Sequence, residues 1–363
     1  MHSIRPRGTL RARCLGLALL VAASVAPQLS SAACSPVGNK MAYLFKTVPT
    51  HQVSVLAHRG LWGKYAPNQG TPENSRASLQ AADDACMDAV ELDVKMTSEG
   101  VPILMHDFNL GRTTNAYQFF RGGVKYDPMS NTGTNPAVST VSWQTIQQMH
   151  LLSPSRDSVT GYFVPDIEGV FSYWQQHGLT TPMVFDTKTA DAVSAIDRLA
   201  QEHFSSPQQV VAVKVNATLY PSYRAFRADA PVIRGIPVYT TNMLTKIDVP
   251  SSRANWQASS SALEINVKQK NGLLQGQLDS VQRAGDASGV FNAIPDGPGS
   301  GEFYSNDGHC CYRLSDLYFS YSGGKDTADN RGDWSYLVSQ GFTFITTDDP
   351  RGLIGFLHSR GLH

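Results

Sequence analysis

The sequence predicts an α/β fold in which a parallel sheet closes into a barrel. Apolar runs that resemble β-strands alternate along the chain with helix-like segments, the pattern of a parallel sheet with crossover helices. Several runs end in ionisable residues, as strands of barrel enzymes do at the catalytic rim. A chain of 363 residues could hold two average domains, but one α/β barrel with insertions routinely occupies about 250 residues or more.

The order of these runs gives the expected elements. Short apolar runs rich in β-branched residues predict strands, and longer segments with apolar residues at helical spacing predict helices. Strands are expected near Val53, Val90, Ile103, Val184, Val211, Ile265, Val290 and Phe344, and the run 236–239 competes for the sixth place. Helices are expected over residues 75–85, 166–177, 191–203 and 272–284.

Five short polar signatures crowd the segment between Leu56 and Thr114, and most of them follow an apolar run. Histidine, carboxylate and arginine side chains are thereby concentrated in a small part of the chain, which favours a catalytic rim. The signatures are His58-Arg59-Gly60, Pro72-Glu73-Asn74-Ser75, Glu91-Leu92-Asp93, His106-Asp107 and Arg112-Thr113-Thr114.

Glu91 and Asp93 indicate a metal site. Successive side chains of a strand point to opposite faces, so these two carboxylates share one face. Neighbouring carboxylates repel each other and stay ionised together most readily around a cation, and oxygen ligands suit one divalent cation such as Mg²⁺ or Ca²⁺. The alternative is a pair of surface acids on an edge strand, which their apolar neighbours disfavour.

His58 and His106 each follow the end of an apolar run. Imidazole is well matched to proton transfer near neutral pH. A single histidine at a strand end is more often a hydrogen-bonded structural residue, but two beside a carboxylate set favour an acid/base pair. Arg59 adds a planar cation that can bind a phosphate through two parallel hydrogen bonds. The set indicates phosphoryl chemistry.

The order and spacing of the five signatures resemble those of the glycerophosphodiester phosphodiesterase family. Its pattern is His-Arg-Gly, Pro-Glu-Asn-Thr, Glu-x-Asp and His-Asp followed by Arg-Thr-Thr. The run 184–188, Val-Phe-Asp-Thr-Lys, resembles the family's acidic-x-Lys strand, and the run 345–350 resembles its closing Thr-Asp-x-Pro strand. The resemblance implies a TIM (β/α)8 barrel and guides the count of eight strands.

The resemblance also implies roles for individual residues. His58 and His106 would be the acid/base pair, and Arg59 and Lys188 would hold the phosphate. Lys214, just after another apolar run, is a further candidate phosphate ligand. Asp186 stands where the family usually has Glu and is one methylene shorter. The implied metal ligands are Glu73, Glu91, Asp93 and Asp186.

The implied activity is metal-dependent hydrolysis of glycerophosphodiesters to glycerol 3-phosphate and an alcohol. The nucleophile is water or the neighbouring hydroxyl of the glycerol. The alternative is a phospholipase of D or C type that acts on intact phospholipids, for which aromatic residues in the segment 115–141 are the hint. A catalytically silent binding module is disfavoured by the intact acid/base set. The expected partner is a small-molecule phosphodiester, and no protein partner is implied.

Residues 1–32 are predicted to be a signal peptide, which leaves 33–363 as a single domain. Four arginines precede the apolar run 15–26, and small residues follow it. The mature protein is therefore expected to be secreted or periplasmic. No stable membrane anchor is expected, because Ser31 stands where a lipid-attachment signal has a large aliphatic residue. Without the leader, 26 basic residues face 30 acidic ones, and this net charge of −4 gives no broad attraction for nucleic acid.

Export makes disulfides possible among the four cysteines that follow the leader, Cys34, Cys86, Cys310 and Cys311. Three pairings are open. A bond from Cys34 to Cys86 would leave the adjacent pair as a vicinal disulfide or as free thiols, and crossed pairings would pin the late loop to the N-terminal region.

Two polar segments, 115–141 and 296–331, are expected to be loop insertions. Both follow runs that should end at the catalytic rim, so they could cover the site and shape the alcohol pocket, or else be solvated decorations. Glu264 and Lys268 share a strand face and could reach the rim, but a peripheral ion pair is the preferred interpretation.

Overall fold

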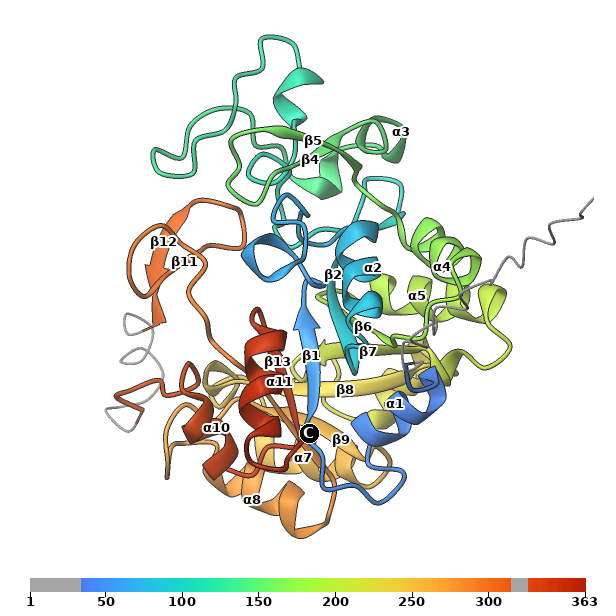
Figure 1. Ribbon diagram of the computed structural model, residues 1–363, viewed down its shortest axis with the longest axis vertical. Helices are drawn as coiled ribbons and strands as arrows, with labels where there is room; N and C mark the ends of the chain where they lie inside the picture. The colour runs from blue at the N-terminus through green and yellow to red at the C-terminus, as the bar shows by residue number, and fades with distance from the viewer. Residues whose placement is uncertain (1–33, 315–325) are drawn as a thin grey trace, which may run out of the picture. The chain divides into compact units, whose positions relative to one another are not determined.

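The computed structural model describes residues 34–314 and 326–363 (Figure 1). The predicted signal peptide lies outside the described residues, as does part of the predicted 296–331 insertion. None of the helices among the described residues combines the length and the apolar character needed to cross a membrane.

Eight parallel strands form a closed barrel. Each strand pairs with the next along the chain, and β1 pairs with both β2 and β13, which closes the sheet. This confirms the predicted (β/α)8 barrel. The strands are β1 (Ser54–His58), β2 (Ala89–Met96), β6 (Met183–Thr187), β7 (Val211–Asn216), β8 (Arg234–Tyr239), β9 (Ala262–Ile265), β10 (Ala287–Phe291) and β13 (Phe344–Thr347).

The expectation of a barrel strand near Ile103 is wrong. That residue lies in β3 (Pro102–Leu104), which pairs antiparallel with β2 outside the barrel. The connection 97–101 is too short for a parallel crossover, which needs a dozen or more residues, so the chain turns back as a hairpin. The competing run 236–239 supplies the missing strand, β8.

The four predicted helices are confirmed with small shifts at their ends. They are α2 (Arg76–Asp84), α4 (Ile167–Gln176), α5 (Ala190–His203) and α8 (Gln275–Arg283). The side chains of Ser75 and Asp166 accept hydrogen bonds from backbone N–H groups in the first turns of α2 and α4, which explains where those helices begin. Further helices are α1 (Val37–Leu44), α3 (Trp143–Ile146), α6 (Tyr223–Asp229), α7 (Val249–Gln257), α10 (Trp334–Ser339) and α11 (Pro350–His358).

The amino-terminal end of the barrel interior is a closed apolar layer. Each barrel strand contributes one residue, and Met41, Leu44 and Phe45 of the α1 region pack on them. A Cβ at Gly289 would lie 1.9 Å from ring carbons of Phe344, so only glycine leaves room for that ring. The strand residues of this layer are Leu56, Ala89, Val184, Ala212, Ile236, Ala262, Ala287 and Phe344.

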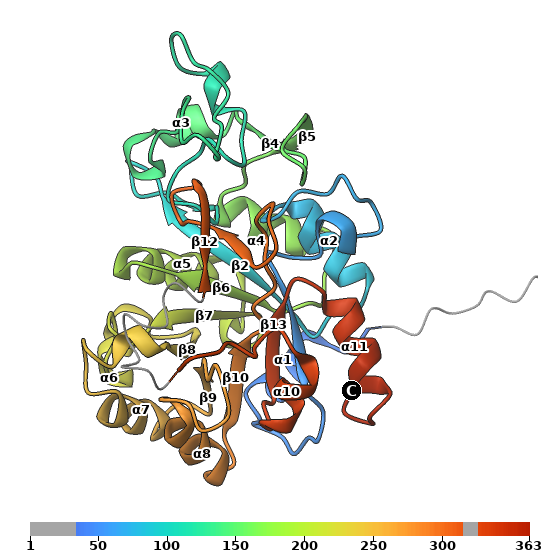
Figure 2. The same cartoon turned by 90° about the vertical axis from the view of Figure 1, so that its left-hand side faces the viewer.

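Two segments extend from the carboxyl end of the barrel (Figures 1 and 2). The first, between β3 and α4, has its own small apolar core, which includes Leu110, Val138 and Ile146, and it carries the hairpin of β4 (His150–Leu152) and β5 (Val159–Phe163). The second is the hairpin of β11 (Glu302–Tyr304) and β12 (Cys310–Arg313). The cysteines form two disulfides, Cys34–Cys86 and Cys310–Cys311, so the adjacent pair is bonded to itself.

Candidate active site

A cavity of about 250 Å³ opens at the carboxyl ends of the barrel strands. Its walls hold most of the side chains that the sequence singles out, although these come from segments up to 156 residues apart, from His58 to Lys214. The predicted site residues that line it are His58, Arg59, Glu91, Asp93, His106, Asp186, Lys188 and Lys214.

Strand alternation explains why these side chains converge. Residues two positions after the apolar inner layer point to the same side of each strand, into the barrel. His58 follows Leu56 in this way, and Glu91 follows Ala89. Asp186, Lys214, Glu264 and Thr346 occupy the corresponding positions of β6, β7, β9 and β13.

Glu91 and Asp93 form the centre of the cluster. A ligand atom from each lies within 4.8 Å of the others and of a ring nitrogen of His58, and both carboxylates are buried. Burial and repulsion from Asp93 raise the pKa of Glu91 to about 7. Burial also opposes ionisation of Asp93, but His106, Arg59 and Lys95 outweigh it and hold the pKa of Asp93 below its usual range. A divalent cation would remove the repulsion between the two carboxylates, so this donor set fits one.

Glu73 lies in a cage of arginines. Its Oε2 is 3.3 Å from Nη1 of Arg59 and 2.9 Å from Nη2 of Arg156, and its Oε1 is 3.6 Å from Nη2 of Arg112. Burial acts against ionisation, but these three cations hold the pKa of Glu73 well below its usual range. Glu73 is outside the 4.8 Å cluster of Glu91 and Asp93. Its role as a metal ligand therefore stays a prediction.

Asp186 and Lys188 form an ion pair that also lines the cavity, with 2.6 Å between Oδ2 and Nζ. Asp186 lies beside Asp93 in the β2–β6 register, so it is close enough in the sheet to join a metal site. Burial would lower the pKa of Lys188, but Asp186 more than offsets this and raises it, so the side chain stays cationic.

Each histidine is oriented by a carboxylate. Asp348 Oδ1 is 2.8 Å from Nδ1 of His58, and Asp107 Oδ1 is 2.7 Å from Nδ1 of His106. An ionised carboxylate only accepts hydrogen bonds, so each Nδ1 carries the proton and Nε2 is left for chemistry. Asp107 is itself fixed by two hydrogen bonds from Arg112, of 2.6 and 2.7 Å.

The sequence profile of the glycerophosphoryl diester phosphodiesterase family matches residues 58–288, more than half of the chain. The chain belongs to this family. Glycerophosphodiester phosphodiesterase 1 of Rattus norvegicus is 42% identical to it over 67 residues, which are 18% of this chain and 18% of the relative. The match thus spans less than a fifth of that relative's length. The bovine protein of the same name is 27% identical over 165 residues, 44% of this chain and 41% of its own.

Solved structures share the fold of this family member. A glycerophosphoryl diester phosphodiesterase from Parabacteroides distasonis superposes with a TM-score of 0.56 at 17% identity, covering 90% of this chain and 93% of its own. An Oleispira antarctica phosphodiesterase, solved in complex with the product sn-glycerol-3-phosphate, gives a TM-score of 0.53 at 16% identity, covering 86% and 98%. Likeness at these identities bears on the fold alone.

Several side chains of the site were missing from the sequence-based set. Asp348 and Asp107 stand within the matched motifs, but nothing in the sequence shows that they contact the histidines. Lys95 lies on the same face of β2 as Glu91 and Asp93, so alternation could have found it. Asp296 could not be found from the local sequence, because its partner Arg59 is distant along the chain. In the structure, Oδ2 of Asp296 is 3.2 Å from Nη1 of Arg59.

The expectation of a peripheral ion pair for Glu264 is wrong. Glu264 is 3% exposed and lies inside the barrel, where its Oε2 is 2.7 Å from Nζ of Lys214. Nζ of Lys214 also donates to the Thr346 hydroxyl at 2.7 Å. Glu264 lies two residues after the inner-layer Ala262, so alternation indicates the inward direction.

The two predicted insertions differ at the cavity. No residue of 115–141 lines it, whereas the described part of 296–331 contributes Asp296 and the hairpin residues Phe303, Tyr304, Asn306 and Tyr312. The aromatic side chains of 115–141 are half-buried or, for Tyr126, buried.

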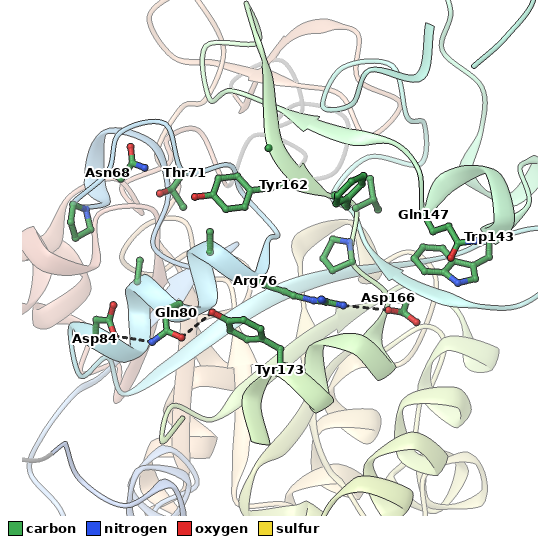
Figure 3. A pocket seen from close by; sticks show the side chains of 17 residues that line it. Asn68, Thr71, Arg76, Gln80, Asp84, Trp143, Gln147, Tyr162, Asp166 and Tyr173 are labelled. Atoms are coloured by element: carbon green, nitrogen blue, oxygen red, sulfur yellow. Dashed lines mark hydrogen bonds and ion pairs between the residues drawn. The ribbon is translucent and has the colours of Figure 1, made fainter. Parts of the chain in front are cut away.

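A larger cavity of about 880 Å³ lies outside the barrel, between α2, α4 and β5 (Figure 3). Arg76 and Asp166 face each other there at 3.9 Å, and Tyr173 donates a hydrogen bond to Gln80. It contains none of the predicted site residues. The smaller barrel cavity therefore remains the candidate active site despite its size.

Proposed function

We propose that this chain is a metal-dependent phosphoric diester hydrolase that cleaves glycerophosphodiesters to glycerol 3-phosphate and an alcohol. The convergence of both carboxylate-oriented histidines with Glu91 and Asp93 on one cavity carries the proposal. Family membership and the relatives' names support it. Phosphoryl transfer needs positioning and electrostatic stabilisation more than covalent chemistry, and this wall of fixed cations and carboxylates provides both.

We assign separate roles to the side chains that line the cavity. Arg59 and Lys188 bind the phosphate, and Lys214 adds a buried positive charge. One imidazole takes a proton from the nucleophile through Nε2, and the other gives one to the departing alcohol. Glu91 and Asp93 would hold one divalent cation, Mg²⁺ or Ca²⁺, with Asp186 and Glu73 as further proposed ligands. When bound, the cation neutralises charge on the phosphate oxygens and makes phosphorus more electrophilic.

The test is a panel of glycerophosphodiesters assayed with EDTA and then with Mg²⁺ and Ca²⁺ restored separately. We expect activity to be lost with EDTA and restored by one or both ions, with release of glycerol 3-phosphate. Full activity in EDTA would remove the metal from the proposal. Phosphorus NMR of the early time course would reveal a cyclic phosphate if the glycerol hydroxyl is the nucleophile.

The competing activity on intact phospholipids receives less support. It needs an exposed apolar rim, and the aromatic side chains of 115–141 that hinted at one are half-buried or, for Tyr126, buried. Val124 and Met129 of that segment are exposed, but they do not line the cavity. Turnover of glycerophosphocholine measured against phosphatidylcholine vesicles separates the two activities, and faster turnover of the vesicles would reverse the preference.

We also propose that the protein is exported. Disulfides persist in oxidising compartments, and the Cys34–Cys86 and Cys310–Cys311 bonds support such a location. Mass analysis of the protein recovered from periplasm or medium should find an amino terminus near residue 33. Recovery of the intact leader in the cytoplasm would contradict the proposal.

A further inference from the structure

The two disulfides differ in the length of chain that they close. Cys34 and Cys86 are 52 residues apart, whereas Cys310 and Cys311 are adjacent. A disulfide stabilises a protein mainly by restricting the unfolded chain, and this effect grows with the length of the closed loop. The Cys310–Cys311 bond restricts almost none of the unfolded chain. Its effect must therefore be local to the β11–β12 hairpin.

The bond lies next to hairpin residues that line the cavity, although neither cysteine lines it. In the β11–β12 pairing, Cys310 is opposite Tyr304 and Tyr312 is opposite Phe303, with a register shift between Phe303 and Tyr304. The rings of Phe303 and Tyr312 are stacked, with centroids 5.8 Å apart. Phe303, Tyr304 and Tyr312 all line the cavity, so the hairpin that contains the disulfide forms one of its aromatic walls.

A chain of hydrogen bonds joins this wall to the proposed phosphate-binding residue. The backbone N–H of Tyr304 donates to Oδ1 of Asp296 at 3.1 Å, and Nη1 of Arg59 lies 3.2 Å from Oδ2 of the same carboxylate. The backbone N–H of Cys310 also donates to the carbonyl of Pro128 at 2.9 Å, which fixes the hairpin to the first insertion. A change at Cys310 therefore acts on the position of Tyr304, and through Asp296 on Arg59.

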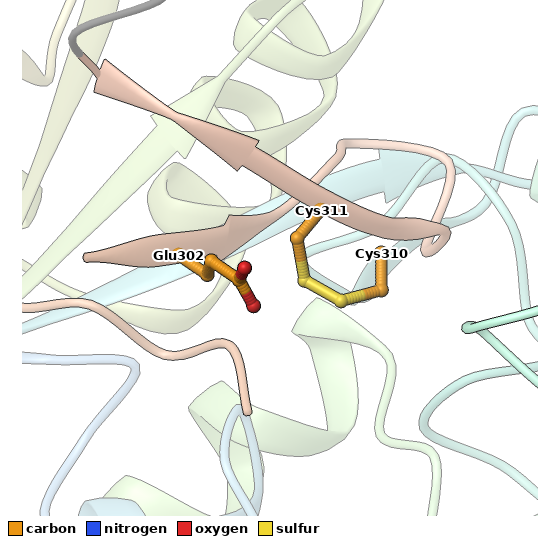
Figure 4. A group of neighbouring side chains, drawn as sticks. All are labelled: Glu302, Cys310 and Cys311. Carbon is orange, nitrogen blue, oxygen red and sulfur yellow. A yellow bond between two sulfur atoms is a disulfide. The ribbon is translucent and has the colours of Figure 1, made fainter. Parts of the chain in front are cut away.

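The two cysteines are partly exposed to solvent. Cys310 and Cys311 are half-exposed, and the Glu302 carboxylate is the polar side chain beside them (Figure 4). The sulfur atoms and a Glu302 oxygen lie within 4.8 Å of one another. Partial exposure of both residues makes the bond a candidate for attack by a small dithiol.

We propose that the Cys310–Cys311 disulfide is a redox modification site that sets the rigidity of the hairpin wall and thereby the affinity of the cavity for the diester. A dithiol reductant supplies the two electrons and two protons. One of its thiolates attacks a cysteine sulfur and breaks the Sγ–Sγ bond, and its second thiol then releases the mixed disulfide. The products are two cysteine thiols and the oxidised, cyclic reductant. The catalytic consequence rests on the proposed function, whereas the change in the hairpin does not.

The test uses two matched double variants of the full mature chain. In Cys34→Ser/Cys86→Ser, dithiothreitol can reduce only the Cys310–Cys311 bond. In Cys310→Ser/Cys311→Ser, that bond is permanently absent. We expect KM for the diester to rise by roughly 3- to 10-fold, with kcat within about twofold, in the reduced first variant and in the untreated second one. Reoxidation should restore KM in the first variant only.

An unchanged KM in Cys310→Ser/Cys311→Ser overturns the proposal. A KM increase accompanied by a fall in the melting temperature of that variant also overturns it, because the bond would then be a general structural element. We expect Cys310→Ser/Cys311→Ser to have the same melting temperature as the wild-type protein, and Cys34→Ser/Cys86→Ser to have a lower one.

Hydrogen exchange of the wild-type protein gives a readout that needs no activity. Reduction followed by alkylation and peptide mapping should speed exchange in residues 302–313, while strand β7 stays unchanged. Faster exchange in a protein that lacks diesterase activity would support the redox site and refute the proposed function. Equal exchange before and after reduction of the mapped bond would refute the redox site.

Discussion

At the amino-terminal end of the barrel the inward side chains are hydrocarbon and pack beneath α1, whereas two residues further along five of the same strands they are ionisable. Leu56 and His58 of β1 show the change, as do Ala262 and Glu264 of β9. The apolar layer can be sealed because nothing has to enter it. The polar layer keeps a cavity lined with charges that hold one another in place. The same strands therefore stabilise the fold at one position and present reactive groups two residues later.

The largest expected effect is at the polar end. Replacing His58 or His106 by Ala should lower kcat by about 10³-fold, because each removes a group that moves a proton. The melting temperature and metal binding should stay close to those of the wild type. His177→Ala, on the exposed end of α4, is the matched control and should keep full activity. Activity near wild type in either variant would remove that histidine from the mechanism.

At the apolar end of the barrel, substitution of a buried side chain by Ala should lower the free energy of unfolding and leave kcat unchanged. Phe344→Ala removes the ring that packs against Gly289 and leaves a cavity there. It should lower the free energy of unfolding by about 3–5 kcal/mol. Urea denaturation measures the loss, and kcat of the folded fraction should be retained. Phe163→Ala, which removes a ring that is 54% exposed, should change the free energy by less than about 0.5 kcal/mol. A large loss of kcat in Phe344→Ala would show that the two layers are not separable.

Replacing the buried ion pair of Lys214 and Glu264 by apolar residues should separate stability from activity. Lys214→Met leaves the buried Glu264 carboxylate without its cation and should lower the free energy of unfolding by about 3 kcal/mol. The double variant Lys214→Met/Glu264→Leu should recover most of that stability, because an apolar pair replaces an ion pair. Its kcat/KM should remain low. Recovery of activity in the double variant would exclude Lys214 from phosphate binding.

The smallest expected effect is on stability and involves the contact between His363 and Asp88. The hydrogen bond to Asp88, with 2.9 Å between Oδ2 and Nε2, raises the pKa of His363 even though burial opposes the shift. The folded state therefore binds the proton more tightly than the unfolded chain. The stabilisation is present in acid and is lost as pH rises through the raised pKa.

Wild type and His363→Ala should thus differ by less than about 1 kcal/mol near pH 6, and the difference should vanish by about pH 9. Chemical denaturation across that range measures it. A difference that grows with pH would contradict the assignment.

Most of the barrel and much of the site could be predicted from the sequence, because apolar runs and alternation are local. The two errors in the fold and the site also have local explanations. The β3 sequence resembles that of a barrel strand, but the connection 97–101 is too short for a parallel crossover. Glu264 was expected at the periphery, but its spacing of two residues from the inner-layer Ala262 places it inside the barrel. Contacts between distant segments are a different case. The Arg59–Asp296 pair and the arginines around Glu73 depend on how the loops pack, and a short motif does not contain that information.

The apolar layer beneath α1 also limits the routes into and out of the cavity. Because Met41, Leu44 and Phe45 pack against the amino-terminal end of the barrel, the cavity is closed on that side. If the protein acts as proposed, water, the diester and both products therefore enter and leave on the carboxyl-terminal side of the barrel. The β11–β12 hairpin, which lines the cavity on that side, can then affect both substrate entry and product release.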